Sequence, residues 1–380
     1  MQAKCAYRAL AAAILIWLAL WDPDVRAAEE AAGYRQVTGP CGLVFPRDHG
    51  PHPGFRTEWW YYTGNLVSGD GRRLGFQLTF FRHQLSPLDT PTEQPEPHSL
   101  WRSHQVYLAH AAVSDIAGKR HLQSAQASRE ALGMAGWDQE RMKVFVGDWS
   151  AVLMPDHQRL EVSSEAFSFR LELTPVKAPV RHGIEGYSRK GSSAERASCY
   201  YSITRLETTG TVTFAGKPPI AVQGVSWMDH EFSTAPLEPG TIGWDWFSIQ
   251  LADRSEYMIF LLRRADGGIH PVSSGTWVDP LGVSRHLERG HFEVDVLDTW
   301  RSRRSGARYP SRWRVKVPPA GVDVIVTSNL PDQEMRPDDL TAIIYWEGSV
   351  SARGTKGADA VEGHGYVELT GYDAPFEALK

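Results

Sequence analysis

Residues 57–66 read TEWWYYTGNL, in which a glutamate is followed directly by four aromatic residues. Large apolar faces beside an ionisable group are the mixture expected of a ligand pocket. Neighbouring side chains on a β-strand point to opposite faces. One face would carry Glu58, Trp60 and Tyr62, and the other Trp59, Tyr61 and Thr63. The segment predicts the wall of an apolar ligand pocket with Glu58 at its end, or else a strand whose rings fill a core and an interface.

A second group of ionisable residues lies in WMDHEFS, residues 227–233. As a strand, this segment has two faces whose ionisable groups converge only if a bulge intervenes. One face carries Trp227, Asp229 and Glu231, and the other carries Met228, His230 and Phe232. His230 on an apolar face is a candidate general acid or base. The alternative is a structural histidine held by hydrogen bonds.

Three arginines, Arg82, Arg205 and Arg263, end or follow apolar stretches. A buried carboxylate is costly unless it is paired. These arginines are therefore expected to form structural ion pairs with Glu58, Glu231 or Glu347.

A weak internal repeat divides the chain. Residues 58–82 can be laid on residues 243–263, each unit being an aromatic strand, a turn and an apolar strand that ends in arginine. The matching pairs are Trp59 with Trp244, Tyr61 with Trp246, Tyr62 with Phe247, Leu66 with Leu251 and Arg82 with Arg263. The repeat predicts one such hairpin in each of two β-barrels, with a boundary near residue 216.

Strand patterns dominate the rest of the chain. The segment FSFRLEL, residues 167–173, alternates strictly between apolar and polar residues, and VDVIV, residues 322–326, is rich in β-branched residues. Asp70-Gly71 and Asp266-Gly267 are hairpin turn signals. Long helical patterns are lacking after the first residues, so the sequence predicts an all-β, antiparallel fold.

The first residues have the pattern of a secretory signal. Lys4 and Arg8 precede an apolar run over residues 9–21, and Val25-Arg26-Ala27 fits a cleavage site. The run is shorter than the roughly 20 residues that span a bilayer. We expect residues 1–27 to be removed, and the mature protein to be periplasmic or secreted, with no transmembrane segment. In that compartment Cys41 and Cys199 could form a disulfide or remain free.

Several classes of chemistry find no support in the sequence. The net charge is −5 with acidic and basic residues interleaved, which does not favour nucleic acid as a partner. No Cys or His set has zinc spacing, and no phosphate-binding or dinucleotide-binding motif is present. The sequence therefore predicts neither a metal site nor a cofactor.

Taken together, these motifs resemble the AttH-like and carotenoid 1,2-hydratase family. The resemblance is carried by segments spread along the chain in order. They are TEWWYYTGNL (57–66), GFQLTFFR (75–82), YLAHAAVSD (107–115), HGIEGYSRKG (182–191), YYSITRL (200–206), WMDHEFS (227–233), GWDWFSIQL (243–251), YWEGSV (345–350) and GYVELTGY (365–372). The resemblance implies two consecutive lipocalin-like antiparallel β-barrel domains, over 28–215 and 216–380. It also implies secretion and an apolar or polyene-like small-molecule ligand.

The hydratase branch of the family suggests which residues could act. Its His-x-Trp and Tyr-x-Asp motifs correspond here to His230 with Phe232 and Tyr257 with Ile259, so the family's acid is replaced by isoleucine. The candidate catalytic residues are therefore His230, Asp229, Glu231, Tyr257 and Glu58. The candidate ligand-binding residues are Trp59, Trp60, Tyr61, Tyr62, Trp227, Phe232, Trp244 and Trp246.

Two functions are compatible with these residues. The first is a binding or carrier protein for an apolar molecule, with an envelope transport system as a partner. The second is a hydratase, cyclase or hydrolase that uses His230 and a nearby carboxylate.

Overall fold

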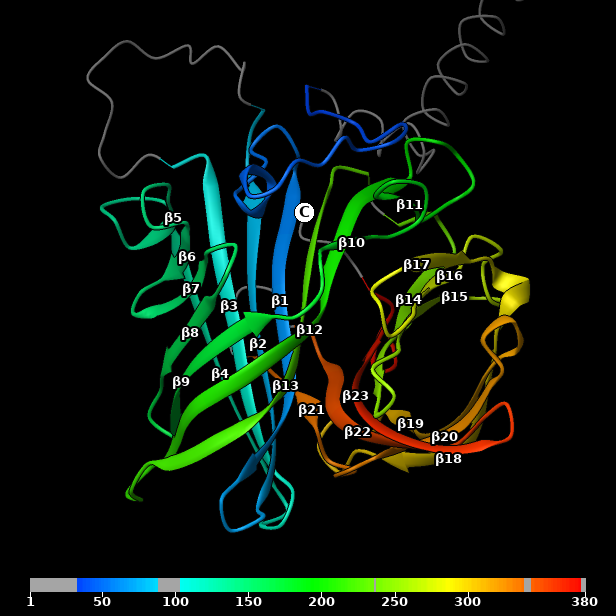
Figure 1. Ribbon diagram of the computed structural model, residues 1–380. Helices are drawn as coiled ribbons and strands as arrows, with labels where there is room; N and C mark the ends of the chain where they lie inside the picture. Colours follow the sequence, from blue (N-terminus) through cyan, green and yellow to red (C-terminus); the bar gives the residue numbers. More distant parts are fainter. Residues whose placement is uncertain (1–32, 88–102, 236, 338–342, 377–380) are drawn as a thin grey trace, which may run out of the picture.

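The computed structural model describes residues 33–87, 103–235, 237–337 and 343–376, and the predicted signal segment lies outside them. The described chain forms two antiparallel β-sheets that lie side by side (Figure 1). Short 3-10 helices are η1 (Arg47–His49), η2 (Arg289–His291) and η3 (Pro318–Ala320). Within these described ranges no helix is long and apolar enough to cross a membrane.

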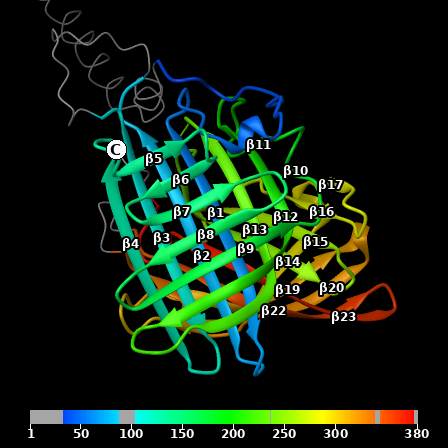
Figure 2. The same cartoon turned by 60° about the vertical axis from the view of Figure 1, so that its left-hand side comes forward.

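The first sheet curls into a nearly closed barrel (Figures 1 and 2). Its strand order is β4-β3-β2-β1-β13-β12-β9-β8-β7-β6-β5, with β10 and β11 paired to β12. Its strands are β1 (Thr57–Ser68), β2 (Arg73–Gln84), β3 (Gln105–Asp115), β4 (Arg120–Arg129), β5 (Ala135–Asp138), β6 (Lys143–Val146), β7 (Trp149–Leu153), β8 (Gln158–Ser163), β9 (Phe167–Pro175), β10 (Val180–Arg181), β11 (Tyr187–Arg189), β12 (Ala197–Phe214) and β13 (Ile220–Ser233).

The second sheet forms a half-barrel with the order β17-β16-β15-β14-β23-β22-β20-β19-β18, and β21 pairs with β22. Its strands are β14 (Thr241–Leu251), β15 (Glu256–Arg264), β16 (Ser274–Val278), β17 (Ser284–Leu287), β18 (Glu293–Arg301), β19 (Arg308–Val317), β20 (Val322–Ser328), β21 (Glu334–Met335), β22 (Tyr345–Lys356) and β23 (Asp359–Thr370). The prediction of an all-β fold with two lipocalin-like units is confirmed.

Three large apolar clusters fill the molecule, and a small fourth one holds Ala112, Met335 and Tyr345. One fills the first barrel and includes Trp60, and a second fills the half-barrel and includes Trp313. A third lies where the two sheets meet and includes Tyr61 and Trp246. Since Trp60 and Tyr61 are neighbours on β1, this strand contributes to the barrel core with one face and to the contact between the sheets with the other.

The predicted repeat is present in the strand register. Strand β1 lies between β2 and β13, and β14 lies between β15 and β23. Trp59 is opposite Phe81 and Trp244 is opposite Leu262, so Arg82 and Arg263 follow at equivalent positions. Each sheet therefore holds one copy of the hairpin on a corresponding pair of strands.

The boundary near residue 216 does not coincide with the change of sheet. Strand β13 pairs with β1 and β12, so residues 220–233 belong to the first sheet. The first sheet ends at Ser233 and the second begins at Thr241. The chain around Gly216, whose φ is +68°, is the hairpin turn between β12 and β13. A turn of this composition has the same sequence signature as a linker, which explains the difference.

Candidate functional site

A cavity of about 490 Å³ lies between the two sheets. Its walls come from β1, β2, β3, β12 and β13 of the first sheet and from β14, β15, β22 and β23 of the second. The wall is largely apolar and carries nine aromatic rings. The rings that line it belong to Trp59, Tyr61, Phe81, Tyr200, Trp244, Trp246, Phe260, Tyr345 and Phe376. Its volume and apolar walls are those of a small-molecule site.

Strand alternation decides which predicted residues reach this cavity. Trp59 and Tyr61 of β1 line it, and so do Asp229 and Glu231 of β13. Trp60 of β1 and His230 of β13 are fully buried on the opposite face, inside the first barrel. One strand thus separates two chemically different compartments.

Asp229 is held in the cavity wall by three hydrogen-bond donors. The Trp227 indole Nε1 and the Tyr200 hydroxyl each donate to its carboxyl group over 2.6 Å, and the Ser202 hydroxyl donates as well. The Tyr200 hydroxyl in turn accepts a hydrogen bond from Trp246 Nε1 at 3.0 Å. Burial raises the pKa of Asp229 to about 7, although these hydrogen bonds lower it.

Two further acids reach the cavity from the second sheet. Glu368 of β23 accepts a hydrogen bond from Trp244 Nε1 at 3.1 Å. Burial, with the charges of Asp229 and Glu231, raises the pKa of Glu368 to about 7. Glu347 of β22 is 2% exposed, and burial and the charge of Glu368 raise its pKa well above the ordinary value. These carboxyl groups therefore keep their protons to a higher pH than exposed glutamates do.

Two polar atoms of the cavity wall make no hydrogen bond of regular geometry within the described part of the chain, although the two groups that carry them interact with each other. They are Oε1 of Glu347 and the hydroxyl oxygen of Tyr61. Nearly all buried polar side-chain atoms in proteins are hydrogen-bonded. Two unsatisfied atoms that face a cavity thus indicate the position of a ligand's polar or charged group.

Lys190 brings a positive charge to the cavity. Its Nζ lies 3.1 Å from Oε1 of Glu231, and the Ser198 hydroxyl donates a hydrogen bond to the same carboxyl group. The ammonium also lies 4.1 Å from the ring centre of Phe260 and 5.1 Å from that of Tyr200. The ring faces of this cavity are therefore placed to hold a cation.

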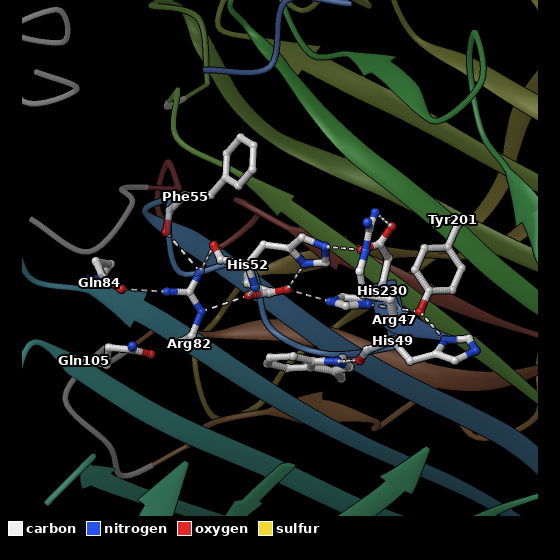
Figure 3. Close-up of polar contacts among 12 residues, drawn as sticks. Arg47, His49, His52, Phe55, Arg82, Gln84, Gln105, Tyr201 and His230 are labelled. Carbon is white, nitrogen blue, oxygen red and sulfur yellow. Dashed lines mark hydrogen bonds and ion pairs between the residues drawn. The ribbon is translucent and has the colours of Figure 1, made fainter. Parts of the chain in front are cut away.

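His230 belongs to a separate hydrogen-bond network inside the first barrel (Figure 3). Its Nε2 lies 2.7 Å from Oε1 of Glu58, and its Nδ1 lies 3.0 Å from the Tyr201 hydroxyl. Nδ1 of His49 lies 2.7 Å from the same hydroxyl. His230 does not line the cavity between the sheets, and burial lowers its pKa, although Glu58 opposes this.

Glu58 is the centre of that network. It is fully buried and accepts hydrogen bonds from Arg82 Nε at 2.8 Å and from the backbone N–H of His52 at 2.8 Å, while His52 Nδ1 lies 2.7 Å away. Burial raises the pKa of Glu58, but the charges of Arg82 and His52 outweigh it and hold the pKa well below the ordinary value. Glu58 is thus an ionised structural acceptor, unlike the acids of the cavity.

The described residues hold one set with the composition of a metal site. His52, Glu58 and His230 have ligand atoms within 4.8 Å of one another. However, the Arg82 guanidinium occupies one carboxylate oxygen of Glu58 and adds a positive charge beside it. Every ligand atom of the set already has a hydrogen-bond partner. The arrangement is therefore that of a closed hydrogen-bond network.

The predicted site residues fall into three groups. Trp59, Tyr61, Trp244, Trp246, Asp229, Glu231 and Glu58 line the cavity. Trp60, Tyr62, Phe232 and His230 lie in the core of the first barrel or stack within it, and Trp227 lies in the cluster between the sheets behind Asp229. Tyr257 and Ile259 pack in the core of the second sheet, away from the cavity.

Several ionisable residues of the cavity were not among the predicted site residues: Arg56, Arg82, His83, His110, Lys190, Glu347 and Glu368. Glu347 was expected to pair with an arginine, and no such ion pair exists among the described residues; Arg82, Arg205 and Arg263 pair instead with Glu58, Glu256 and Asp245. The usable signal was the alternation of aromatic and acidic residues in Tyr345-x-Glu347 and Tyr366-x-Glu368, which matches that of β1 and β13.

Comparisons with known proteins agree with this architecture. The AttH-like family model matches residues 36–372. The crystal structure of a protein described as an AttH from Nitrosomonas europaea is 33% identical, with 89% of this chain and 99% of that chain covered and a TM-score of 0.77. The structure of kievitone hydratase from Nectria haematococca is 15% identical, with 90% and 98% covered and a TM-score of 0.66, and it shares the fold. No curated protein matches the chain.

The family model extends over most of the sequence and includes every strand of both sheets. The chain therefore belongs to the AttH-like family.

Proposed function

We propose that this protein binds an apolar, unsaturated small molecule between its two sheets and adds water to a carbon–carbon double bond of that molecule. The observation that carries the proposal is Glu347, a buried carboxyl group in an aromatic cavity with an oxygen that makes no hydrogen bond of regular geometry to any described residue. A carboxylic acid kept protonated near neutral pH is the group that alkene protonation requires.

The proposed reaction needs one acid, one water molecule and the aromatic walls. The proton of Glu347 moves to one alkene carbon, and the other carbon becomes a carbocation. The ring faces of Trp59 and Trp246 stabilise that positive charge. Water then forms a bond to the cation, and its extra proton passes to the Glu347 carboxylate, either directly or through Asp229. The net change is the addition of one water molecule, and the protein is regenerated.

The location expected from the sequence forms part of the proposal. We infer that the protein works outside the cytoplasm after removal of residues 1–27. The disulfide between Cys41 and Cys199 supports this, because such bonds persist mainly in oxidising compartments. Fractionation of the producing cells, with sequencing of the mature N-terminus, tests it.

A panel of alkenes tests the hydratase activity. The purified protein would be incubated in heavy water with isoprenoids that have trisubstituted double bonds, and the products analysed by mass spectrometry. We expect a product that contains one added water and a deuterium on carbon, and loss of that product in Glu347→Gln. Product formation that survives in Glu347→Gln would remove this residue as the acid.

A carrier function is the second candidate, and one observation favours it. The position that corresponds to the acid of the hydratase branch is Ile259, which lies in the apolar core of the second sheet. A carrier would retain an apolar molecule through purification and release it unchanged to an envelope transport system. Mass spectrometry of organic extracts from protein isolated from its native cells distinguishes the two, because a carrier yields one unmodified compound and no hydrated partner.

A further inference from the structure

The carboxyl groups of the cavity outnumber the cations that could neutralise them. Besides Glu58, which is paired with Arg82, four acids line the cavity. They are Asp229, Glu231, Glu347 and Glu368. Glu231 is paired with Lys190, but none of the other three forms a salt bridge within the part of the chain that the structure describes. The cavity thus presents three carboxyl groups without a positive partner.

Besides Lys190, the basic residues of the cavity lining are Arg56, Arg82, His83 and His110. Arg82 is bound to Glu58 and to the backbone carbonyls of His52 and Phe55. Burial and the charges of Arg56 and Arg82 lower the pKa of His83 to about 4, so this residue is neutral at physiological pH. Arg82 and His83 therefore do not compensate the three acids.

The aromatic walls are arranged to accept a positive charge. The ammonium of Lys190 already lies over the rings of Phe260 and Tyr200. The rings of Trp59, Tyr61 and Trp246 line the same space, and in the described part of the chain no cation lies over any of them. Aromatic faces combined with carboxyl groups form the usual recognition site for alkylammonium ions.

We propose that this cavity binds amphiphilic cations, namely an alkylammonium group on an apolar body, with the charge placed between Glu347, Glu368 and the tryptophan rings. The proposal deepens the proposed function and rests on the same cavity being the ligand site. The two are linked chemically, because a carbocation and an ammonium ion place the same charge among the same groups. An alkylammonium ion is thus a ligand in its own right and an inhibitor of the hydration.

The two unsatisfied atoms indicate where the positive charge of the ligand lies. Oε1 of Glu347 and the hydroxyl oxygen of Tyr61 both face the cavity and can both accept a contact from a cation. A carboxylate ligand at this point would meet Glu368 and Asp229, which become negatively charged above about pH 7, so acids of the same length are expected to be rejected.

The test compares three probes of one chain length: decyltrimethylammonium, decanol and decanoate, each kept below its micelle concentration. Quenching of tryptophan fluorescence and calorimetry report binding. We expect the ammonium to bind at least about tenfold more tightly than decanol, and decanoate to bind more weakly than either. Equal affinity for decanol and the ammonium, or tighter binding of decanoate, would overturn the proposal.

Protonation of the cavity acids should weaken the binding of the cation. The groups that face Glu347 are Glu368 and Tyr61, with Asp229, Glu231 and Lys190 in the same cavity wall. Since these acids lose protons as the pH rises, affinity for decyltrimethylammonium should increase from about pH 5 to about pH 8, while affinity for decanol stays constant. A flat profile for the ammonium would contradict the assigned position of the charge.

Substitution separates this inference from the hydratase activity. In a Glu347→Gln and Glu368→Gln double variant the preference for the ammonium over decanol should disappear, while decanol still binds. Glu362→Gln, an exposed residue on the same strand as Glu368, is the matched control and should keep the preference. If the protein prefers the ammonium to decanol but does not hydrate isoprenoids, only the proposed hydratase activity is contradicted. If the protein hydrates isoprenoids but does not prefer the ammonium to decanol, only the proposed binding of amphiphilic cations is contradicted.

Discussion

At the scale of single residues, this protein has two kinds of buried acid. Glu58 is surrounded by donors and cations, and its pKa lies well below the ordinary value. Glu347 is buried without a cation, and burial raises its pKa far above that value. The sequence indicated acids beside aromatic rings, but it did not reveal which acids have partners. That distinction depends on residues more than 200 positions apart along the chain, such as Tyr61 and Glu347.

Glu368→Gln should stabilise the protein at neutral and higher pH. The pKa of Glu368 is about 7 in the folded protein and near 4.5 when unfolded, so the folded state holds a proton that the unfolded state loses between these values. The free energy of unfolding of the wild type therefore falls as the pH rises through this window. Because Glu368 is only partly buried, we expect a gain of about 1–2 kcal/mol for Glu368→Gln at about pH 8 and little at about pH 4.

Thermal or urea unfolding at the two pH values measures this difference. Glutamine retains an oxygen that can accept the hydrogen bond from Trp244. Glu362→Gln on the same strand is the control, and its stability should follow that of the wild type. A gain for Glu368→Gln that is equal at both pH values would show that its proton affinity is not the cause.

Glu58→Gln should be strongly destabilising. It leaves the Arg82 guanidinium, which is 1% exposed, without a negative partner, and removal of one member of a buried ion pair costs about 3–5 kcal/mol. Since the pKa of Glu58 is lowered on folding, its contribution is present above the unfolded pKa and is lost as the pH falls through the folded one. The deficit relative to the wild type should therefore shrink in acid.

Urea unfolding over a pH series gives the measurement. The matched control is Glu172→Gln, whose partner Arg159 is well exposed and whose loss should cost about 1 kcal/mol or less. An equal loss of unfolding free energy in the two variants would mean that the network of Figure 3 contributes no more to stability than an exposed ion pair does.

At the scale of elements, strand patterns predicted most of what the structure contains. The period of two residues along β1, β9 and β13 placed each side chain on its correct face. The position of a strand beside its distant neighbours was not predictable, because register across the sheets depends on contacts far apart in sequence. For this reason the cavity acids of β22 and β23 were missed. The boundary was placed near residue 216 because the turn there has the composition of a linker, whereas β12 and β13 pair across it.

The disulfide fixes the segment before β1 to β12, and its loss should weaken the first barrel. Cys41 and Cys199 are 158 residues apart, and Cys199 is buried on β12. Closing a long loop restricts the unfolded chain, so a Cys41→Ala and Cys199→Ala double variant should lose about 2–5 kcal/mol. Urea unfolding of the variant, compared with wild type in the presence and absence of reductant, checks this. A variant as stable as the oxidised wild type would contradict it.

At the scale of the whole molecule, the two sheets behave as one body because charged residues cross between them. Glu256 of β15 is fully buried and pairs with Lys177 at 2.6 Å and with Arg205 of β12 at 2.5 Å. Asn65 of β1 donates a hydrogen bond to the backbone carbonyl of Gly365 in β23. The all-β, two-unit architecture was predicted from the sequence, but these contacts and the cavity they enclose required the structure.

Glu256→Gln should loosen that connection. It leaves Lys177 and Arg205 without their carboxylate in a buried position, at a cost of about 3–5 kcal/mol. We expect calorimetry to show a lower and broader transition, and the tryptophans of the cavity to become more accessible to acrylamide. Lys316→Gln, which breaks the exposed pair with Glu293, is the control. A sharp transition at the wild-type temperature would show that the sheets are joined mainly by their apolar contact.

The shared wall formed by β1 and β13 has a consequence for directed evolution of this protein. Consecutive positions of β1 serve separate compartments, with Trp59 and Tyr61 against the cavity, and with Trp60 and the carboxyl group of Glu58 in the barrel interior. A combinatorial library that varies every second codon would change ligand preference and leave the interior network of Figure 3 intact. In a library of equal size that varies adjacent codons, most variants would also change residues of the barrel interior. We expect those variants not to fold.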